Sequence, residues 1–129
     1  MEKGRILIVD DSELVLAMAR DALEDGGYTV VTATNGIEAN QYIFSKNRPD
    51  LIILDVMLPL LDGNKKAKLL REKDFSKEIP ILLLSSKPED ELRHLTLDAG
   101  ADGFIRKPFT PDGIVGKVRE VLAKMRARL

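Results

Sequence analysis

The sequence predicts an α/β fold in which a parallel sheet of five strands carries helices on both faces, and two features predict it. The first is a set of short runs that are apolar at every position, such as Leu-Ile-Ile-Leu at 51–54. Runs of this kind are typical of strands buried on both faces of a sheet. The second is the strict alternation of these runs with segments of helical periodicity, which favours right-handed crossovers and therefore a doubly wound sheet.

Five strands and five helices are expected. The strands are placed at 5–9, 28–33, 51–54, 81–84 and 102–106, and the helices at about 13–25, after Asn35, at 64–72, from Pro88 to Gly100, and from Pro111 to the C-terminus. Ser12 or Asp11 can cap the first helix, and Asn35 with Glu38 resembles a capping box for the second. The apolar segment 56–63 is expected to pack as a loop.

The inner faces of the helices follow from the spacing of their apolar residues. The expected inner residues are Leu14, Met18, Ala22 and Leu23 in the first helix, Ile37, Ala39 and Ile43 in the second, Ala67 and Leu70 in the third, Leu92, Leu95 and Ala99 in the fourth, and Ile114, Val115, Val118, Val121, Leu122 and Met125 in the fifth.

Composition limits the function classes. A chain of 129 residues that is 44% hydrophobic suits one compact domain, residues 1–129. Its 20 basic and 21 acidic residues nearly cancel, which does not suggest a protein that binds nucleic acid directly. Without cysteine, and with His94 as its one histidine, the chain lacks the ligands of common zinc sites. No signal peptide or membrane-spanning stretch is visible, so we expect a cytoplasmic protein with no membrane contact.

Reactive side chains follow four of the five expected strands. Asp10 and Asp11 follow the first strand, Asp55 the third, Ser85 the fourth and Lys107 the fifth. In the flavodoxin-like strand order 2-1-3-4-5, the second strand lies at the edge and the other four ends surround one crevice, where ligands of open α/β sheets bind. Each residue alone has an ordinary explanation as a turn or cap residue, but their shared position predicts a functional site.

The charges of this cluster predict a cation. Two carboxylates about 4 Å apart repel by about 4 kcal/mol at an effective dielectric constant of 20, and here three converge. Lys107 supplies one positive charge, so a divalent cation with oxygen ligands is expected, and Mg²⁺ fits because it takes only a few carboxylates. These groups are also the parts needed for phosphoryl transfer, with Asp55 as the nucleophile because it lies between the others.

Four motifs carry a resemblance that covers essentially the whole chain. They are Ile-Leu-Ile-Val-Asp-Asp at 6–11, Leu-Asp-Val-Met-Leu-Pro at 54–59 followed by Asp62-Gly63, Pro-Ile-Leu-Leu-Leu-Ser at 80–85, and Gly-Ala-Asp-Gly-Phe-Ile-Arg-Lys-Pro-Phe at 100–109. With these motifs the chain resembles the CheY-like receiver domain of two-component response regulators. The resemblance implies a phosphoprotein that acts as a signalling switch rather than as a classical enzyme.

The resemblance also assigns roles to the residues. Asp55 would accept a phosphoryl group from a sensor histidine kinase or a histidine phosphotransfer protein. Asp11, Asp55 and the backbone carbonyl of Met57 would bind Mg²⁺, and Asp10 would act through water. Ser85 would bond the new phosphoryl oxygen, and Lys107, preceding a cis proline bond to Pro108, would pair with it.

Phosphorylation is then expected to change the surface formed by the fourth helix, fifth strand and fifth helix. In the family, the aromatic residue at Phe104 rotates inward as the hydroxyl at Ser85 moves. Phe104 replaces the more usual tyrosine and Ser85 the commoner threonine, so the signal would rest on burial of the ring. That surface would meet an unknown downstream target, with the chain as a monomer or a phosphorylation-dependent dimer.

Met57 and Lys87 resemble the variable positions that control how water reaches the acyl phosphate. Apolar Met57 is expected to slow hydrolysis, whereas the effect of Lys87 stays open. We expect His94 to be solvent-exposed. The basic residues of the last helix are expected to be a solvated face rather than a nucleic-acid patch: Lys117, Arg119, Lys124, Arg126 and Arg128.

Three other functions share parts of this pattern. A haloacid-dehalogenase-type phosphatase needs a second aspartate two residues after the nucleophile, where this chain has Met57. A flavodoxin-type flavin carrier needs a phosphate-binding loop after the first strand, where Asp10 and Asp11 would repel a phosphate. A degenerate receiver that serves only as a docking module is disfavoured by the intact functional positions. The chain ends with the last helix, so it is expected to be either a stand-alone receiver or part of a longer regulator.

Overall fold

The computed structural model describes residues 3–127 and confirms the predicted alternation of strands and helices. The elements are β1 (Arg5–Val9), α1 (Glu13–Asp25), β2 (Thr29–Ala33), α2 (Gly36–Ile43), β3 (Leu51–Asp55), α3 (Gly63–Arg71), β4 (Ile81–Ser85), α4 (Glu89–Ala99), β5 (Gly103–Arg106) and α5 (Pro111–Ala127). All strand pairs are parallel, and their order β2-β1-β3-β4-β5 is the order that was predicted.

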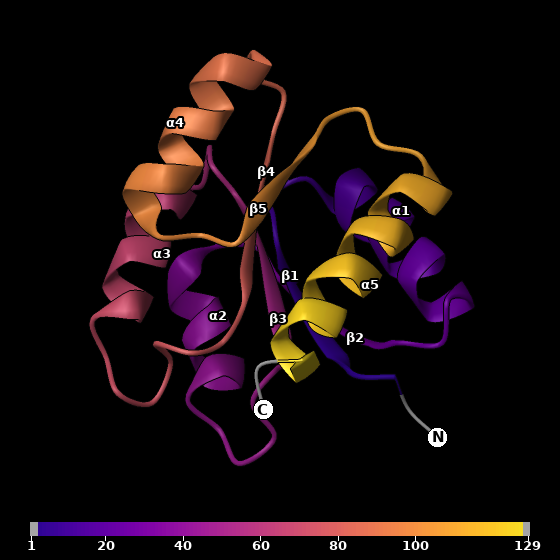
Figure 1. Cartoon of the computed structure of the whole chain (residues 1–129), viewed down its shortest axis with the longest axis horizontal. Helices are drawn as coiled ribbons and strands as arrows, with labels where there is room; N and C mark the ends of the chain where they lie inside the picture. The colour runs from indigo at the N-terminus through magenta and orange to yellow at the C-terminus, as the bar shows by residue number, and fades with distance from the viewer. Residues whose placement is uncertain (1–2, 128–129) are drawn as a thin grey trace.

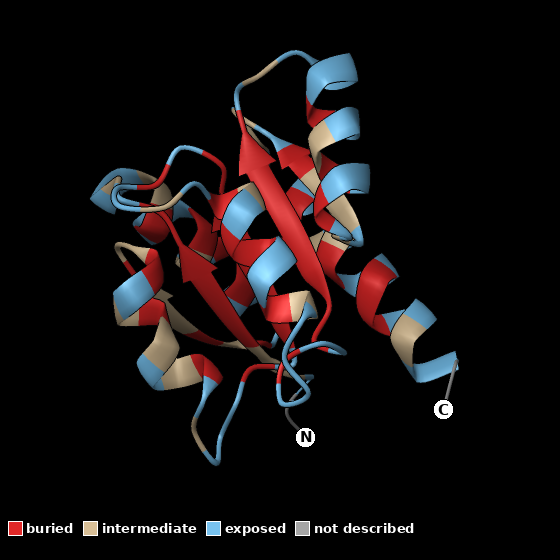
Figure 2. Ribbon diagram, turned by 90° about the vertical axis from the view of Figure 1, so that its left-hand side faces the viewer, coloured by how far each residue is buried: buried red, intermediate tan, exposed pale blue. Residues whose placement is uncertain are grey.

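The sheet lies between two layers of helices. Figure 1 shows α1 and α5 on one side of it and α2, α3 and α4 on the other. Successive side chains of a strand point to opposite faces, so Ile53 packs toward α1 and α5 whereas Ile52 and Leu54 pack toward the other three helices. Every residue of β3 and β4 is buried, as the red strands in Figure 2 show. This two-sided burial explains the continuous apolar runs of the sequence.

The predicted inner face of α1 is wrong in part. Leu14 and Met18 are 70% and 47% exposed, and the buried residues of the helix are Leu16, Ala19, Ala22 and Leu23. Both sets have helical spacing, but Leu14 and Leu16 lie roughly opposite each other at 3.6 residues per turn. Ile37, in the first turn of α2, is likewise exposed. The buried stripes in α3 and α5 agree with the prediction at Ala67, Leu70, Ile114, Val118, Val121 and Leu122.

The helix ends show which capping residues act. Ser12, not Asp11, caps α1, with its side chain accepting a hydrogen bond from the N–H of Val15. Asn35 caps α2 as predicted. In a full capping box the Glu38 carboxylate would also accept from the Asn35 N–H. Among the described hydrogen bonds it accepts instead from the Thr34 hydroxyl at 3.0 Å. Gly100 ends α4 in the left-handed conformation, with φ of 71°.

The loop between β3 and α3 packs only in part. Val56 and Leu58 are buried, but Met57 and Leu60 are 64% and 77% exposed, so the expectation of a packed loop is right for half of these residues. Leu60 adopts a positive φ of 74°, a conformation that disfavours side chains with a Cβ.

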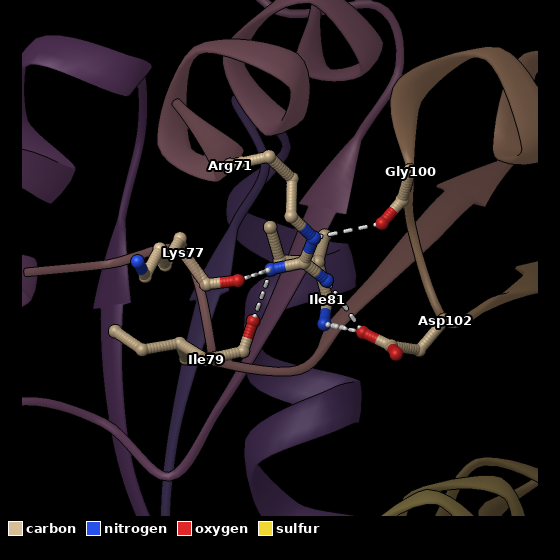
Figure 3. A network of polar contacts seen from close by, with 6 residues as sticks. All are labelled: Arg71, Lys77, Ile79, Ile81, Gly100 and Asp102. Atoms are coloured by element: carbon tan, nitrogen blue, oxygen red, sulfur yellow. Dashed lines mark hydrogen bonds and ion pairs between the residues drawn. The ribbon is translucent and has the colours of Figure 1, made fainter. Parts of the chain in front are cut away.

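Arg71, the last residue of α3, lies at the amino ends of β4 and β5, at the edge of the sheet opposite the predicted site (Figure 3). Its guanidinium donates to the Gly100 carbonyl (2.8 Å), to the Lys77 and Ile79 carbonyls (3.1 and 2.6 Å) and to the Asp102 carboxylate (2.6 Å). Asp102 also accepts from the N–H of Ile81 at 2.8 Å. One side chain therefore ties α3 to the segments that lead into β4 and β5.

The structure describes neither the first two nor the last two residues of the chain. Residues 1–2 and 128–129 lie outside the described residues, so the predicted last turn of the final helix and the basic residue Arg128 are not part of this description. His94 is exposed on α4, as predicted. Among residues 3–127, no helix combines the length and the apolar character needed to cross a membrane.

Candidate functional site

Three carboxylates meet at the carboxyl edge of the sheet. Asp10 and Asp11 follow β1, and Asp55 ends β3, which pairs with β1 so that Val9 lies beside Leu54. One carboxylate oxygen of each aspartate lies within 4.8 Å of the others. Asp10 and Asp55 are buried, whereas Asp11 is exposed. The structure thus brings together the three acids that the sequence placed at one crevice.

Asp10 is oriented by contacts to both of its oxygens. Its Oδ1 accepts a hydrogen bond from the N–H of Ser12 at 2.9 Å, and its Oδ2 lies 2.8 Å from the Lys107 ammonium. Ser12 therefore has two roles, since its side chain caps α1 and its backbone holds Asp10. This second role could not be predicted, because nothing in the residue pattern reports where a backbone N–H points.

Lys107 lies between two of the acids. Its Nζ is 2.8 Å from Asp10 and 3.4 Å from Asp55, and its backbone N–H bonds the carbonyl of Ser85 at the end of β4. The Lys107–Pro108 bond is cis, as expected. Burial alone would lower the pKa of Lys107, but the facing carboxylates of Asp10 and Asp55 raise it above its ordinary value. The side chain therefore stays charged and shares its positive charge between both acids.

Asp55 is the acid whose ionisation is most altered. Burial, and next the charge of Asp10, raise the pKa of Asp55 from an ordinary value of 3.8 to about 6. The Lys107 ammonium and the N–H of Met57, which lies 3.4 Å from Asp55 Oδ1, act in the opposite direction. The charge of Lys107 therefore offsets only part of the effect of burial and of the repulsion from Asp10.

The remaining predicted residues lie on the neighbouring strands and loops. Ser85 is buried at the end of β4, and its Oγ accepts a hydrogen bond from the N–H of Lys87 at 3.0 Å. Met57 follows Asp55 by two residues and its side chain is exposed. Phe104 lies on β5 opposite Leu83 and is half-buried against the core beside α4.

The donor set suits a hard divalent cation. With three carboxylates and one ammonium, the formal charge of the cluster is about −2, and all ligand atoms are oxygen, which Mg²⁺ prefers over nitrogen and sulfur. Asp10, Asp11 and Asp55 are the side chains that could hold such an ion. Because burial and the charge of Asp10 raise the pKa of Asp55, a cation bound beside Asp55 would favour its ionised form.

Two residues near the site make contacts that the sequence does not predict. Gly63 belongs to one of the motifs that carry the resemblance, but the motif does not predict that its backbone lies directly against Asp55. Arg106 precedes Lys107 and donates from Nε to the carbonyl of Lys87 at 3.1 Å. Both contacts depend on how the loops fold over the sheet, and hydrophobic periodicity does not report this.

The fold and the pocket define a class: a doubly wound α/β domain with an acidic, lysine-bridged pocket at the carboxyl ends of its central strands. The family model described as the response regulator receiver domain matches residues 6–119. The chain belongs to this family, the CheY-like receiver domains of two-component systems. Receiver domains are signalling switches rather than classical enzymes, and they bind Mg²⁺ at an acidic pocket.

Individual relatives agree with this assignment. The chain is 41% identical over 120 residues to the alkaline phosphatase synthesis transcriptional regulatory protein PhoP of Bacillus subtilis, covering 93% of this chain and 49% of that protein. It is 42% identical over 125 residues to the response regulator MprA of Mycobacterium ulcerans, covering 97% and 50%. The chain thus spans about half the length of these curated relatives.

Solved structures share the fold. A response regulator from Chloroflexus aurantiacus J-10-fl superposes with a TM-score of 0.87 at 38% identity, covering 93% of this chain and 98% of that one. The chemotaxis response regulator CheY4 of Vibrio cholerae gives a TM-score of 0.84 at 35% identity, covering 92% and 98%. Each superposition covers almost the full length of both chains.

Proposed function

We propose that Asp55 accepts a phosphoryl group from a phosphohistidine of a sensor histidine kinase or a histidine phosphotransfer protein. The observation that carries this proposal is the single ammonium of Lys107, 3.4 Å from Asp55 and 2.8 Å from Asp10, inside a cluster of three carboxylates. An acceptor carboxylate with a fixed cation at its side is what phosphoryl transfer requires, because the protein contributes mainly position and charge.

The transfer step follows from these groups. A carboxylate oxygen of Asp55 forms a bond to phosphorus while the phosphorus–nitrogen bond of the donor breaks, and the electron pair of that bond stays on the imidazole nitrogen. With a pKa of about 6, Asp55 is mainly ionised at neutral pH and can attack. Lys107 is placed to pair with the phosphoryl oxygens. Bound Mg²⁺ supplies further positive charge to those oxygens.

The other residues would divide between cation binding and signalling. Asp10, Asp11, Asp55 and the backbone carbonyl of Met57 would hold Mg²⁺, with Asp10 acting through water. Ser85 would turn toward the phosphoryl group, and Phe104 would rotate inward behind it. The face formed by α4, β5 and α5 would then meet a downstream target, either as a monomer or as a phosphorylation-dependent dimer.

The proposal takes residues 1–129 as one receiver domain that works in the cytoplasm. The nearly balanced charge of the chain supports contact with a protein target rather than with nucleic acid or a membrane surface. Because Asp10, Asp11 and Asp55 are all present in the pocket, it does not support a role as a degenerate docking module that works without phosphorylation.

A small-molecule phosphodonor tests the proposal without the unknown kinase. With Mg²⁺ and acetyl phosphate, intact-mass spectrometry should show addition of one phosphoryl group to the wild-type chain and none to Asp55→Asn. Asp74→Asn is the matched control, because Asp74 lies between α3 and β4, away from the acidic pocket, and its one ion pair among residues 3–127 is with Lys77 at the surface. Equal labelling of Asp55→Asn and wild type, or no labelling of either, would contradict the assignment of Asp55.

A further inference from the structure

The hydroxyl of Ser85 is held by the loop that follows it. Its Oγ accepts from the N–H of Lys87 at 3.0 Å, so the short segment from Ser85 to Lys87 forms a closed turn. The carbonyl of Lys87 accepts from Arg106 Nε at 3.1 Å. Both backbone polar groups of Lys87 are therefore bonded, one to Ser85 and one to Arg106.

The position of Arg106 is set by the sheet. Arg106 is the residue of β5 that lies directly opposite Ser85 of β4, and the next residue, Lys107, donates its N–H to the Ser85 carbonyl at 2.8 Å. Since side chains alternate along a strand, Arg106 and Phe104 extend to the same face of β5. Arg106 thus lies beside Ser85, Phe104 and Lys107, the three residues on which the proposed switch depends.

Arg106 has no evident role in stabilising the core. Its side chain is exposed, and among residues 3–127 its guanidinium makes no ion pair. The ammonium of Lys87 pairs instead with Glu91, in the first turn of α4, at 3.3 Å. The contact between Arg106 and Lys87 therefore joins the end of β5 to the loop between β4 and α4.

We infer that Arg106 is a positioning residue that restrains the loop from Ser85 to Lys87 in the unphosphorylated conformation. The inference rests on the proposed function of Asp55. When Ser85 turns toward a phosphoryl group, the loop that its bond to the Lys87 N–H closes moves with it. Movement of the loop breaks the bond from Arg106 to the Lys87 carbonyl. Arg106 therefore adds to the free energy needed to reach the phosphorylated conformation.

Beryllofluoride with Mg²⁺, as a stable stand-in for the phosphoryl group, measures this free energy directly. Arg106→Met removes the donor but keeps the aliphatic stem. Losing one hydrogen bond from a charged donor at the surface should lower the half-saturating beryllofluoride concentration about three- to tenfold. Arg93→Met is the matched control, because Arg93 is also an exposed arginine near this loop, but within the described part of the chain it pairs only with Glu89, on its own helix. It should titrate like wild type.

Amide hydrogen exchange of Lys87, measured without beryllofluoride, is the second readout. It should be faster in Arg106→Met than in wild type and Arg93→Met, because the loop opens more often. Equal half-saturating concentrations in wild type and Arg106→Met would overturn the positioning role. If wild type itself does not bind beryllofluoride, the proposed function fails instead, and unchanged Lys87 exchange would then show that Arg106 does not restrain the loop either.

Discussion

Gly63 packs against the backbone of Asp55 so closely that a Cβ on Gly63 would lie 2.0 Å from the Asp55 carbonyl oxygen. The N–H of Gly63 also donates to the Val56 carbonyl at 2.9 Å. The first turn of α3 is therefore docked directly on the end of β3. The absence of a side chain at Gly63 is what allows the helix to approach the acceptor strand.

Replacing this glycine tests the contact. Gly63→Ala should lower the free energy of unfolding by about 1–3 kcal/mol, since α3 or the end of β3 must move to accommodate the methyl group. The control is Gly116→Ala in α5, where a Cβ meets no atom within 4 Å. That change should raise stability by about 0.5–1 kcal/mol. Urea unfolding measures both, and equal effects of the two substitutions would contradict the steric explanation.

The main features of this fold could be predicted because parallel strands are buried on both faces. The apolar runs at β1, β3 and β4 have no polar face, so they identify central strands, and the residue that ends each run marks the rim of the sheet. The convergence of Asp10, Asp55 and Lys107 follows from strand order alone. These predictions use only periodicity and topology.

The features that could not be predicted depend on how the helices and loops pack on the sheet. Leu14 has the spacing of a buried residue in α1 but lies on the opposite side from Leu16, and only the packed helix distinguishes the two stripes. Gly63 and Arg106 act through single close contacts that leave no periodic signal. Leu60 holds a positive φ in a loop where glycine is the residue expected on conformational grounds.

The Arg71 network in Figure 3 should contribute substantially to stability. Arg71→Met leaves three carbonyls and the half-buried Asp102 carboxylate without this donor, which should cost about 2–3 kcal/mol. Lys68→Met in the same turn is the control, because Lys68 and Asp98 are both exposed and lie 4.0 Å apart. Its effect should be below about 0.5 kcal/mol. Urea unfolding of both variants checks the difference, and similar losses would show that the network adds little.

The raised pKa of Asp55 predicts how stability depends on pH without Mg²⁺. The folded state holds a proton on Asp55 up to about pH 6, whereas the unfolded chain releases it near 3.8. The stabilisation that comes from protonated Asp55 is therefore fully present below pH 3.8 and is lost as the pH rises to about 6. Over this range the free energy of unfolding should fall by about 2–3 kcal/mol. Asp55→Asn carries no such titration, so its stability relative to wild type should increase across this range.

Unfolding of wild type and Asp55→Asn in a chelating buffer at several pH values measures this difference. A constant difference would show that Asp55 ionises normally in the folded protein. Adding Mg²⁺ should stabilise wild type at neutral pH and much less at pH 4, because carboxylate ligands must be deprotonated to bind the ion.

Met57 should control the lifetime of the phosphoryl group if Asp55 is the acceptor. Its N–H contacts the Asp55 carboxylate at 3.4 Å, and its apolar side chain is exposed two residues from the acceptor. A thioether chain there offers an approaching water only a weak acceptor, whereas an amide can hydrogen-bond it and orient it. Met57→Asn should therefore shorten the acyl-phosphate half-life several-fold, measured by loss of phosphoryl mass after the donor is removed.

Leu60→Asn separates this effect from a general change in the loop. Leu60 is exposed on the same loop, and asparagine suits its positive φ better than leucine does. The variant should be at least as stable as wild type while the acyl-phosphate half-life stays unchanged, because the amide is introduced farther along the loop from Asp55. If Met57→Asn and Leu60→Asn shorten the half-life equally, or if neither does, exclusion of water by the Met57 side chain is not what sets the lifetime.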